Sequence, residues 1–189
     1  MAAPALPTPR YEHVGPHGPF KDVYEPAEDT FLLLDALEQD ADCLRQARVE
    51  ICLEIGSGSG VVSAFLASII GSSALYICTD INPMAAHCTM ETALLNSVDL
   101  QPIITDLVES HGIEASWAGG RKGREVMDRV FPLVPDLLSP GGLFYLVTIK
   151  ENDPDEILDT MKECGLEGTR VLSRQAGQEM LTILKFKKS

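Results

Sequence analysis

Short apolar runs alternate with longer amphipathic runs along this chain, which is the pattern of alternating strands and helices. We expect strands over 49–53, 74–79, 100–104 and 143–149, and helices over 61–70, 84–96, 124–138 and 155–164. Two final apolar runs, 169–173 and 180–186, suit an antiparallel pair near one edge of the sheet. This order predicts an α/β fold with a doubly wound, Rossmann-like sheet.

The two ends of this pattern set the expected domain. Residues 1–20 are rich in Pro, Gly and His without periodicity, so we expect a disordered leader there and a single domain over 21–189. Pro102 lies inside the third expected strand, where it cannot donate a ladder hydrogen bond. That strand is therefore expected at an edge of the sheet.

A glycine-dense turn follows the first expected strand. Glu54 ends the strand, and Gly56, Gly58 and Gly60 follow in a Gly-x-Gly-x-Gly spacing before the apolar helix begins. Glycines at these positions allow unusual backbone angles and a close approach to a ligand. Twenty residues after Gly60, the next apolar run ends in Asp80. These features predict the first half of a nucleotide-type βαβ site.

The charges at this turn indicate the class of ligand. The glycine spacing is one residue short of the dinucleotide fingerprint, and the carboxylate of Glu54 would repel a pyrophosphate. A ligand with a cationic amino-acid end and a ribose fits better, because Asp80 can accept both ribose hydroxyls while Glu54 faces the cation. S-adenosylmethionine has these groups. A turn that only connects a strand to a helix is the alternative, and the coincidence of strand, glycines and distant carboxylate disfavours it.

A third carboxylate, Asp106, follows the expected strand 100–104. Since parallel strands end at the same edge of a sheet, Glu54, Asp80 and Asp106 should face one crevice. Asp106 is placed to accept from an adenine amino group, although a capping or turn role is equally open when it is taken alone.

The composition of the chain limits which ligands, partners and cellular compartments are expected. The net charge of −13 over 189 residues disfavours a dedicated DNA or RNA enzyme. Five scattered cysteines without a Cys-x-x-Cys pair, and only four histidines, predict no metal site and a reducing, intracellular location. No run of 18 apolar residues and no secretory signal occur, so we expect no membrane association.

With these residues in place, the chain resembles the class I S-adenosylmethionine-dependent methyltransferases. The segments Pro26-Ala27-Glu28-Asp29-Thr30 and 114–123 are more specific and are similar to the HemK family, above all its eukaryotic branch. That family methylates the glutamine of the Gly-Gly-Gln motif in translation release factors. The resemblance implies that the cofactor contacts are Thr30, Glu54, Gly56, Gly58, Asp80, Asp106 and Leu107.

One family motif is missing. The family holds the amide to be methylated with an Asn-Pro-Pro-Tyr loop after its fourth strand, whereas this chain has no Pro-Pro dipeptide. We interpret this as a deletion of about one strand and its loop near 108–109, as a skipped exon would produce, which removes the central strand. The resemblance therefore implies a shortened enzyme that has lost its catalytic residues, and the strands 49–53 and 143–149 must pair directly or leave open edges.

The resemblance also implies partners and alternatives. It implies a release factor as substrate, a small zinc-binding activator subunit along strand 100–104, and a location in the cytoplasm and nucleus. A non-catalytic form that binds cofactor or partner is one alternative, and histone lysine or N6-adenine DNA methylation are others. His87 and His111 could act as bases, although a lone histidine is usually structural or solvent-facing, and Trp117 could stack a substrate or pack in the core. The basic residues Arg121, Lys122 and Arg124 could meet a substrate carboxylate, but a solvated helix start is favoured.

Overall fold

The computed structural model describes residues 6–106 and 124–189. The chain divides into two compact units, Met1–Leu107 and Val108–Ser189, and each is described by itself. Leu107, the expected deletion point at 108–109, His111, and the family segment 114–123 lie outside the described residues.

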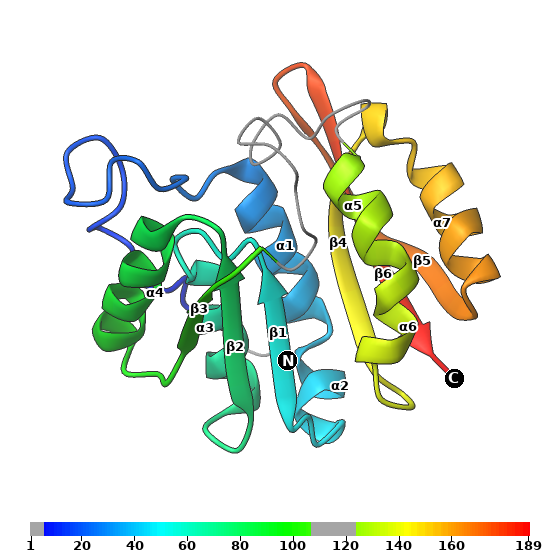
Figure 1. Cartoon of the computed structure of the whole chain (residues 1–189), viewed down its shortest axis with the longest axis horizontal. Coiled ribbons are helices and arrows are strands. Elements are labelled where there is room, and N and C mark those ends of the chain that lie inside the picture. Colours follow the sequence, from blue (N-terminus) through cyan, green and yellow to red (C-terminus); the bar gives the residue numbers. More distant parts are fainter. Residues whose placement is uncertain (1–5, 107–123) are drawn as a thin grey trace, which may run out of the picture. The chain divides into compact units, whose positions relative to one another are not determined.

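The first unit contains a three-stranded parallel sheet. Its strands are β1 (Ile51–Ile55), β2 (Leu75–Asp80) and β3 (Gln101–Ile104), in the spatial order β1-β2-β3 (Figure 1). Glu54 is paired with Cys78, and Asp80 with Ile104. The edge position that Pro102 predicts for its strand is confirmed, because β3 is the last strand of this sheet.

Helices cover one face of this sheet. The unit has α1 (Glu28–Gln39), α2 (Ala41–Gln46), α3 (Val61–Ile70) and α4 (Pro83–Asn96), with α1 and α2 in contact with α3. Residues of α3, α4 and β2 form a buried cluster with Leu100: Ala64, Ala67, Tyr76, Cys78 and Ala93. No helix in the described part of the chain is long and apolar enough to span a membrane.

The opposite face of the sheet is apolar and exposed. Ile51, Leu53 and Ile55 alternate along β1 on this face, and the registers place Leu75 and Ile103 beside them. Their exposed fractions run from 37% for Ile55 to 61% for Ile51. Each of these residues is of a type that proteins usually bury, so the face has the composition of an interior surface without the burial of one.

The N-terminal segment differs from the expected disordered leader. Tyr11, Val14, Phe20 and Val23 pack around Cys88 of α4, and Val14 and Val23 are buried. The backbone of Arg10 also exchanges hydrogen bonds of 2.7 and 2.9 Å with the side chain of Asn96. The segment is held because its few apolar residues, too widely spaced to give a periodic pattern, all reach one helix.

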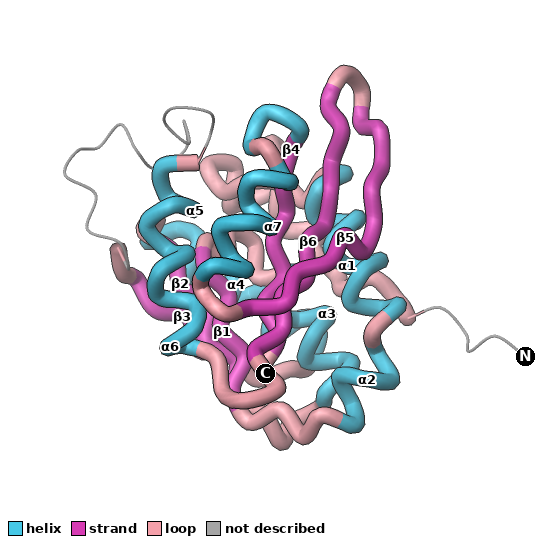
Figure 2. Tube along the Cα trace, turned by 90° about the vertical axis from the view of Figure 1, so that its right-hand side faces the viewer, coloured by secondary structure: helices cyan, strands magenta, loops and turns pink. Residues whose placement is uncertain are grey.

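The second unit is built on an antiparallel sheet. Its strands β4 (Leu143–Ile149), β5 (Leu166–Ala176) and β6 (Glu179–Lys188) lie in the order β4-β6-β5 (Figure 2). The antiparallel pair expected from the last two apolar runs is confirmed as β5 and β6, which are longer than predicted. Together the two units confirm the α/β class.

The helices of this unit correct one expectation. A single helix over 124–138 is wrong: the structure has α5 (Glu125–Val130), a 3-10 turn (Phe131–Leu133) and α6 (Val134–Leu137). Pro132 and Pro135 lie in the two later pieces, where a proline cannot continue an α-helical hydrogen-bond ladder. A second 3-10 turn (Lys150–Asn152) precedes α7 (Pro154–Glu163).

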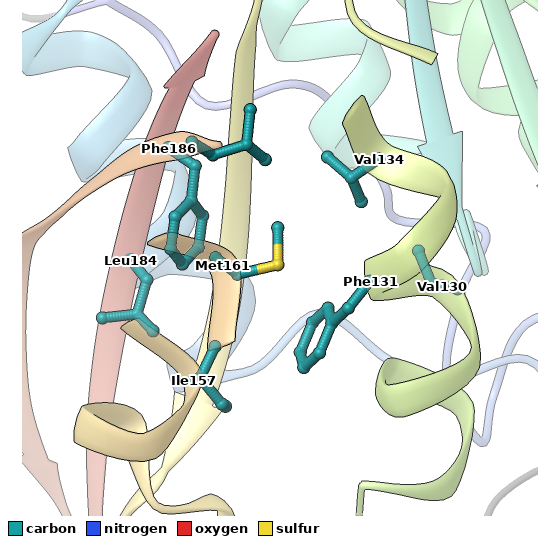
Figure 3. Close-up of a cluster of buried hydrophobic side chains, with 8 residues drawn as sticks. Val130, Phe131, Val134, Ile157, Met161, Leu184 and Phe186 are labelled. Carbon is teal, nitrogen blue, oxygen red and sulfur yellow. The ribbon is translucent and has the colours of Figure 1, made fainter. Parts of the chain in front are cut away.

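A buried apolar cluster packs the helices of the second unit against its sheet. Figure 3 shows Ile157 and Met161 of α7 beside Leu184 and Phe186 of β6, with Phe131 and the α5–α6 segment facing them. The other members of the cluster are Val130, Val134 and Leu166. Four of its side chains, Ile157, Met161, Leu184 and Phe186, have no exposed surface.

Arg124 is not the solvated residue that the sequence suggested. Only 6% of it is exposed, and its guanidinium pairs with Asp128 at 2.9 Å and with Glu156 at 2.8 Å. It also donates to the backbone oxygen of Asn152 at 3.2 Å. One arginine thereby joins the start of α5 to the start of α7.

Candidate cofactor site

The glycine turn is fixed to the end of β2. The backbone N–H groups of Gly56 and Ser57 both donate to the carbonyl of Thr79, at 2.8 and 2.9 Å, and Gly60 N–H donates to Ser57 O at 2.8 Å. The φ angles of Gly56, Gly58 and Gly60 are +73°, +50° and +76°. Since L side chains rarely adopt such angles, the three glycines are required by the path of the turn.

The three glycines face different surroundings. A Cβ added to Gly56 or Gly58 would meet no atom within 4 Å, so both border open space. A Cβ added to Gly60 would lie 2.8 Å from the side chain of Thr89 in α4. The first two positions can therefore admit a ligand to the backbone, whereas Gly60 lets the turn pack against α4.

Asp80 is held at the mouth of this turn. Its Oδ2 accepts a hydrogen bond of 2.9 Å from Gly58 N–H, and its Oδ1 accepts one of 2.9 Å from Asn82 N–H. A carboxylate oxygen has two lone pairs, so each oxygen retains one for a further donor. Two vicinal hydroxyl groups would match this arrangement.

Glu54 lies on the same face of the sheet as Asp80, and its carboxylate accepts hydrogen bonds from Ser63. The donors are the backbone N–H of Ser63, at 3.2 Å, and the Ser63 hydroxyl, and both come from the first turn of α3. The pKa of Glu54 is raised to about 7, chiefly by burial; the Ser63 hydrogen bonds oppose the shift, and the charge of Asp80 adds to it. A cationic group would favour the ionised form of Glu54.

Ser57 is a site residue that the sequence did not single out. It is 5% exposed, and its hydroxyl oxygen has no hydrogen-bond partner among the described residues. A buried hydroxyl usually has a partner, so the unpaired Ser57 hydroxyl is a candidate contact for a polar ligand atom. The only signal in the sequence is its position between Gly56 and Gly58.

Two threonines of α4 lie beneath the turn and were also missed. Thr92 Oγ1 donates to Ser59 O at 2.6 Å, and Thr89 Oγ1 to Gly58 O at 3.4 Å. Neither threonine has exposed surface. These bonds direct two carbonyls of the loop toward α4.

Two further residues were expected to contact the cofactor, Asp106 and Thr30. Asp106 follows the end of β3, and Thr105 N–H donates to Asp80 O at 3.0 Å, so Asp106 comes from the strand beside β2 as expected. Thr30 lies in the first turn of α1, where its hydroxyl meets Ala27 N and Asp29 Oδ1, both at 3.4 Å. The structure thus brings Glu54, Gly56, Gly58 and Asp80 together, while the contacts of Thr30 are local.

Among the described residues we find no metal-binding cluster, and the thiol beside Glu54 is not reactive. No group of three or more His, Cys, Asp or Glu side chains within 6–106 and 124–189 is arranged to hold a metal. All five cysteines are free, and burial raises the pKa of Cys78, on the strand beside Glu54, to about 12. This thiol stays protonated at neutral pH and does not act as a nucleophile.

The arrangement of the site fits one class of ligand. The open space at two glycines, the unpaired Ser57 hydroxyl and two carboxylates suit a nucleoside with a ribose and a cationic amino-acid group. The residues present therefore fit S-adenosylmethionine.

Comparison with known proteins identifies relatives along the whole chain. This chain is 62% identical to the methyltransferase HEMK2 of Mus musculus and 64% identical to that of Homo sapiens, with 100% of both chains covered in each case. Both alignments run over 217 residues, whereas this chain has 189. The catalytic subunit mtq2 of the eRF1 methyltransferase of Schizosaccharomyces pombe is 34% identical over 88% of this chain and 90% of its own length.

Solved structures agree with these relatives. The chain superposes on a structure of the E. cuniculi Mtq2–Trm112 complex, responsible for the methylation of the eRF1 translation termination factor, with a TM-score of 0.68 and 26% identity, covering 89% of this chain and 99% of the other. The fold is shared with the T. Thermophilus 16S rRNA methyltransferase RsmC, at a TM-score of 0.67 and 19% identity over 87% of this chain and 44% of the other. No family model matches the chain. From its sequence relatives and their fold, the chain belongs to the HemK family of methyltransferases, in the branch that includes HEMK2.

Proposed function

We propose that this chain binds S-adenosylmethionine at the glycine turn. Asp80 would accept the ribose hydroxyls, Glu54 would face the cationic amino-acid end, and Ser57 would supply a polar contact. The observation that carries this proposal is the open turn at Gly56 and Gly58, closed on one side by an Asp80 carboxylate whose two oxygens are each fixed by one backbone N–H.

The chain's own residues bind the cofactor and orient it. When bound, the cofactor supplies an electrophilic methyl group. Asp80 and the turn fix the position of the ligand before any reaction, because their hydrogen bonds to each other exist without it. Glu54 can hold a proton on its carboxyl group near neutral pH and release it when a cation binds, since its pKa is about 7.

We further propose that the reaction of the family, N-methylation of the glutamine in the Gly-Gly-Gln motif of a release factor, is lost or strongly reduced in this chain. The relative named for eRF1 methylation supports this substrate. The missing Asn-Pro-Pro-Tyr segment supports the loss, because nothing in the sequence replaces the groups that orient the amide. The relatives' alignments, longer than this chain, support an internal deletion.

The sheets support the same interpretation. β1 and β4 are apolar strands, yet each lies at the edge of its own three-stranded sheet. Strands of this composition are typical of the centre of a parallel sheet, where both faces and both edges are covered. A further strand, of the kind that the missing segment would supply, would account for the edge position of each.

A small activator subunit is the partner that we propose, along β3. This edge strand exposes Ile103 and Ile104, and α4 exposes Met90 and Leu94, at 45% to 73% of their surface. An added strand could pair with β3 and cover these side chains. The E. cuniculi relative, solved as a complex with Trm112, supports a partner of this kind.

A non-catalytic form that holds cofactor or partner is therefore the function that the site supports best. Methylation of adenine in DNA is a second candidate of the family, and the net charge of −13 disfavours it. Histone lysine is a further candidate substrate of the intact family. The five free cysteines support a reducing compartment, and we propose the cytoplasm and nucleus.

The test separates binding from transfer. The purified chain is incubated with S-adenosylmethionine carrying a labelled methyl group, irradiated to cross-link bound cofactor, and assayed in parallel for transfer to a release factor with the activator subunit present. We expect labelled cofactor to cross-link to the chain, and we expect S-adenosylhomocysteine or the Asp80→Asn substitution to reduce this cross-linking. In the parallel assay we expect no label to be transferred to the release factor. Absence of cross-linking would contradict the proposed site, whereas turnover near that of a full-length relative would contradict the proposed loss.

A further inference from the structure

The N-terminal segment, residues 9–23, is tied to the glycine turn by one histidine. His13 lies on this segment, and its Nε2 is 2.9 Å from Thr92 Oγ1 and 3.4 Å from the backbone oxygen of Cys88, both on α4. Thr92 Oγ1 in turn lies 2.6 Å from Ser59 O in the turn. A continuous chain of polar contacts therefore runs from His13 to the backbone of the turn.

The chemistry of the partners fixes the direction of these bonds. A backbone carbonyl can only accept a hydrogen bond, so the Thr92 hydroxyl donates its single hydrogen to Ser59 O. The hydroxyl must then accept from His13, which requires a hydrogen on Nε2, and the contact with Cys88 O requires the same. The other ring nitrogen, Nδ1, is buried without a partner among the described residues. This suits the neutral tautomer with its hydrogen on Nε2, since an unpaired acceptor is less costly there than an unpaired N–H.

The ring of His13 is also held from the side. The ring of Phe20 meets it edge to face, with 5.6 Å between the centroids and 88° between the planes. Thr92 has no exposed surface, so water cannot take the place of a lost donor without opening the packing. His13 is therefore a fixed donor to a buried hydroxyl that orients a carbonyl of the turn.

We propose that His13 is a positioning residue of the cofactor site, acting through Thr92 on Ser59 to keep the turn open to the ligand. This inference rests on the proposed binding of S-adenosylmethionine at the turn. Loss of the His13 donor frees the Thr92 hydroxyl to rotate away from Ser59 O. The backbone between Gly58 and Gly60 then samples more conformations, and the cofactor must order it on binding. The segment that looked like a disordered leader is part of the site.

Matched variants test this inference. His13→Phe keeps a ring against Phe20 but removes the donor, and Thr92→Val keeps the shape but removes the hydroxyl. His13→Gln and Thr92→Ser keep the respective donors. His17→Phe is the control, since His17 is exposed on the same segment. The dissociation constant of S-adenosylhomocysteine is measured for each full-length chain by calorimetry, and the amide hydrogen exchange of residues 58–61 is measured without ligand.

Each removed donor should weaken binding roughly threefold to tenfold, the effect of one neutral hydrogen bond. The double variant His13→Phe/Thr92→Val should be no weaker than either single variant, because both break the same chain of contacts. His13→Gln, Thr92→Ser and His17→Phe should stay within about twofold of the wild type. Amide hydrogen exchange at residues 58–61 should rise by a similar factor in His13→Phe and in Thr92→Val, but not in the conservative variants or the His17→Phe control.

The outcomes separate this inference from the proposed function. A wild-type chain that binds, together with a His13→Phe variant that binds equally well, overturns the positioning role and leaves the cofactor site standing. Additive losses in the double variant also overturn it, since they indicate two independent structural effects. A wild-type chain that does not bind overturns the proposed function and the role of His13 in it, while unchanged exchange in His13→Phe shows separately that His13 does not hold the turn.

Discussion

Gly58 and Asp80 lie 22 residues apart in the sequence and are joined by a hydrogen bond of 2.9 Å from the backbone N–H of Gly58 to Oδ2 of Asp80. This bond closes the glycine turn against the end of β2. The carboxylate thus has two roles, because it holds the turn in shape and presents its remaining lone pairs to a ligand.

The two roles of Asp80 predict that Asp80→Asn weakens both ligand binding and stability. An amide keeps one acceptor oxygen but loses the charge and the second acceptor, so the affinity for S-adenosylhomocysteine should fall at least about tenfold. Stability should fall by about 1.5–3 kcal/mol, since hydrogen bonds to a charged acceptor contribute on this scale. Calorimetric titration and denaturant unfolding measure the two. Asp99→Asn, at an exposed aspartate of the same unit, is the control and should change neither.

Gly58 and Gly60 should separate binding from stability. Gly60→Ala places a Cβ 2.8 Å from Thr89 at a φ of +76°, so strain and overpacking should together cost roughly 2–4 kcal/mol in the free energy of unfolding. Gly58→Ala meets no atom within 4 Å, so only the backbone penalty of about 1–2 kcal/mol applies. Its methyl group enters the space that we assign to the cofactor, so binding should be lost. Equal stability losses in urea unfolding would contradict the described packing.

Glu54 should make stability depend on pH near neutrality. Its pKa is raised from 4.5 to about 7 in the folded chain, so the folded state holds the proton more tightly than the unfolded state. The stabilisation from this proton is complete below pH 4.5 and is lost as the pH rises through 7. Glu54→Gln removes this loss and should be more stable than the wild type at pH 8 by roughly 1–3 kcal/mol. Unfolding curves between pH 5 and pH 8 test it, with exposed Glu50→Gln as control.

The same carboxyl group should couple ligand binding to pH. The cationic end of S-adenosylhomocysteine favours the ionised form of Glu54, so the ligand should bind more tightly at pH 8 than at pH 6, and the wild type should release protons on binding near pH 7. Titrations in buffers of different ionisation enthalpy measure the released protons. Proton uptake, or release that persists in Glu54→Gln, would contradict the role of Glu54.

Arg124 should contribute to the stability of the second unit. Its fork joins Asp128 and Glu156, and only 6% of the residue is exposed. Both carboxylates are half exposed, so water can compensate them in part, and Arg124→Ala should cost roughly 1–3 kcal/mol rather than the full cost of breaking a buried pair. Arg129→Ala, at an exposed position of the same helix, should change stability little. Equal effects of the two, measured by urea unfolding, would mean that Arg124 holds nothing together.

Much of the fold could be read from the chain because its signals are local. The helix over 61–70 and the strand over 143–149 were predicted to the residue, since a turn sets each boundary. Pro102 predicted an edge strand through its missing donor. The single helix over 124–138 failed because Pro132 and Pro135, each tolerated at a first helical turn, divide it into pieces.

The candidate site could be predicted only in its charged and glycine residues. Glu54 and Asp80 were found because strand ends carry ligands in this fold class, and glycines are visible in any sequence. His13, Ser57 and Thr92 were missed, because their roles arise from contacts such as the 79-residue separation between His13 and Thr92. A histidine in an aperiodic segment gives no sign of the helix that it will meet.

The central claim is that this chain binds the methyltransferase cofactor at its glycine turn, and a thermal unfolding curve with and without S-adenosylhomocysteine tests it most directly. At a ligand concentration about 100-fold above the dissociation constant, binding adds roughly 2.7 kcal/mol, or several degrees in a chain of this length. We expect a cooperative transition that the ligand raises in the wild type and raises much less in Asp80→Asn. A transition that is indifferent to the ligand, or a chain with no cooperative transition, would contradict the account.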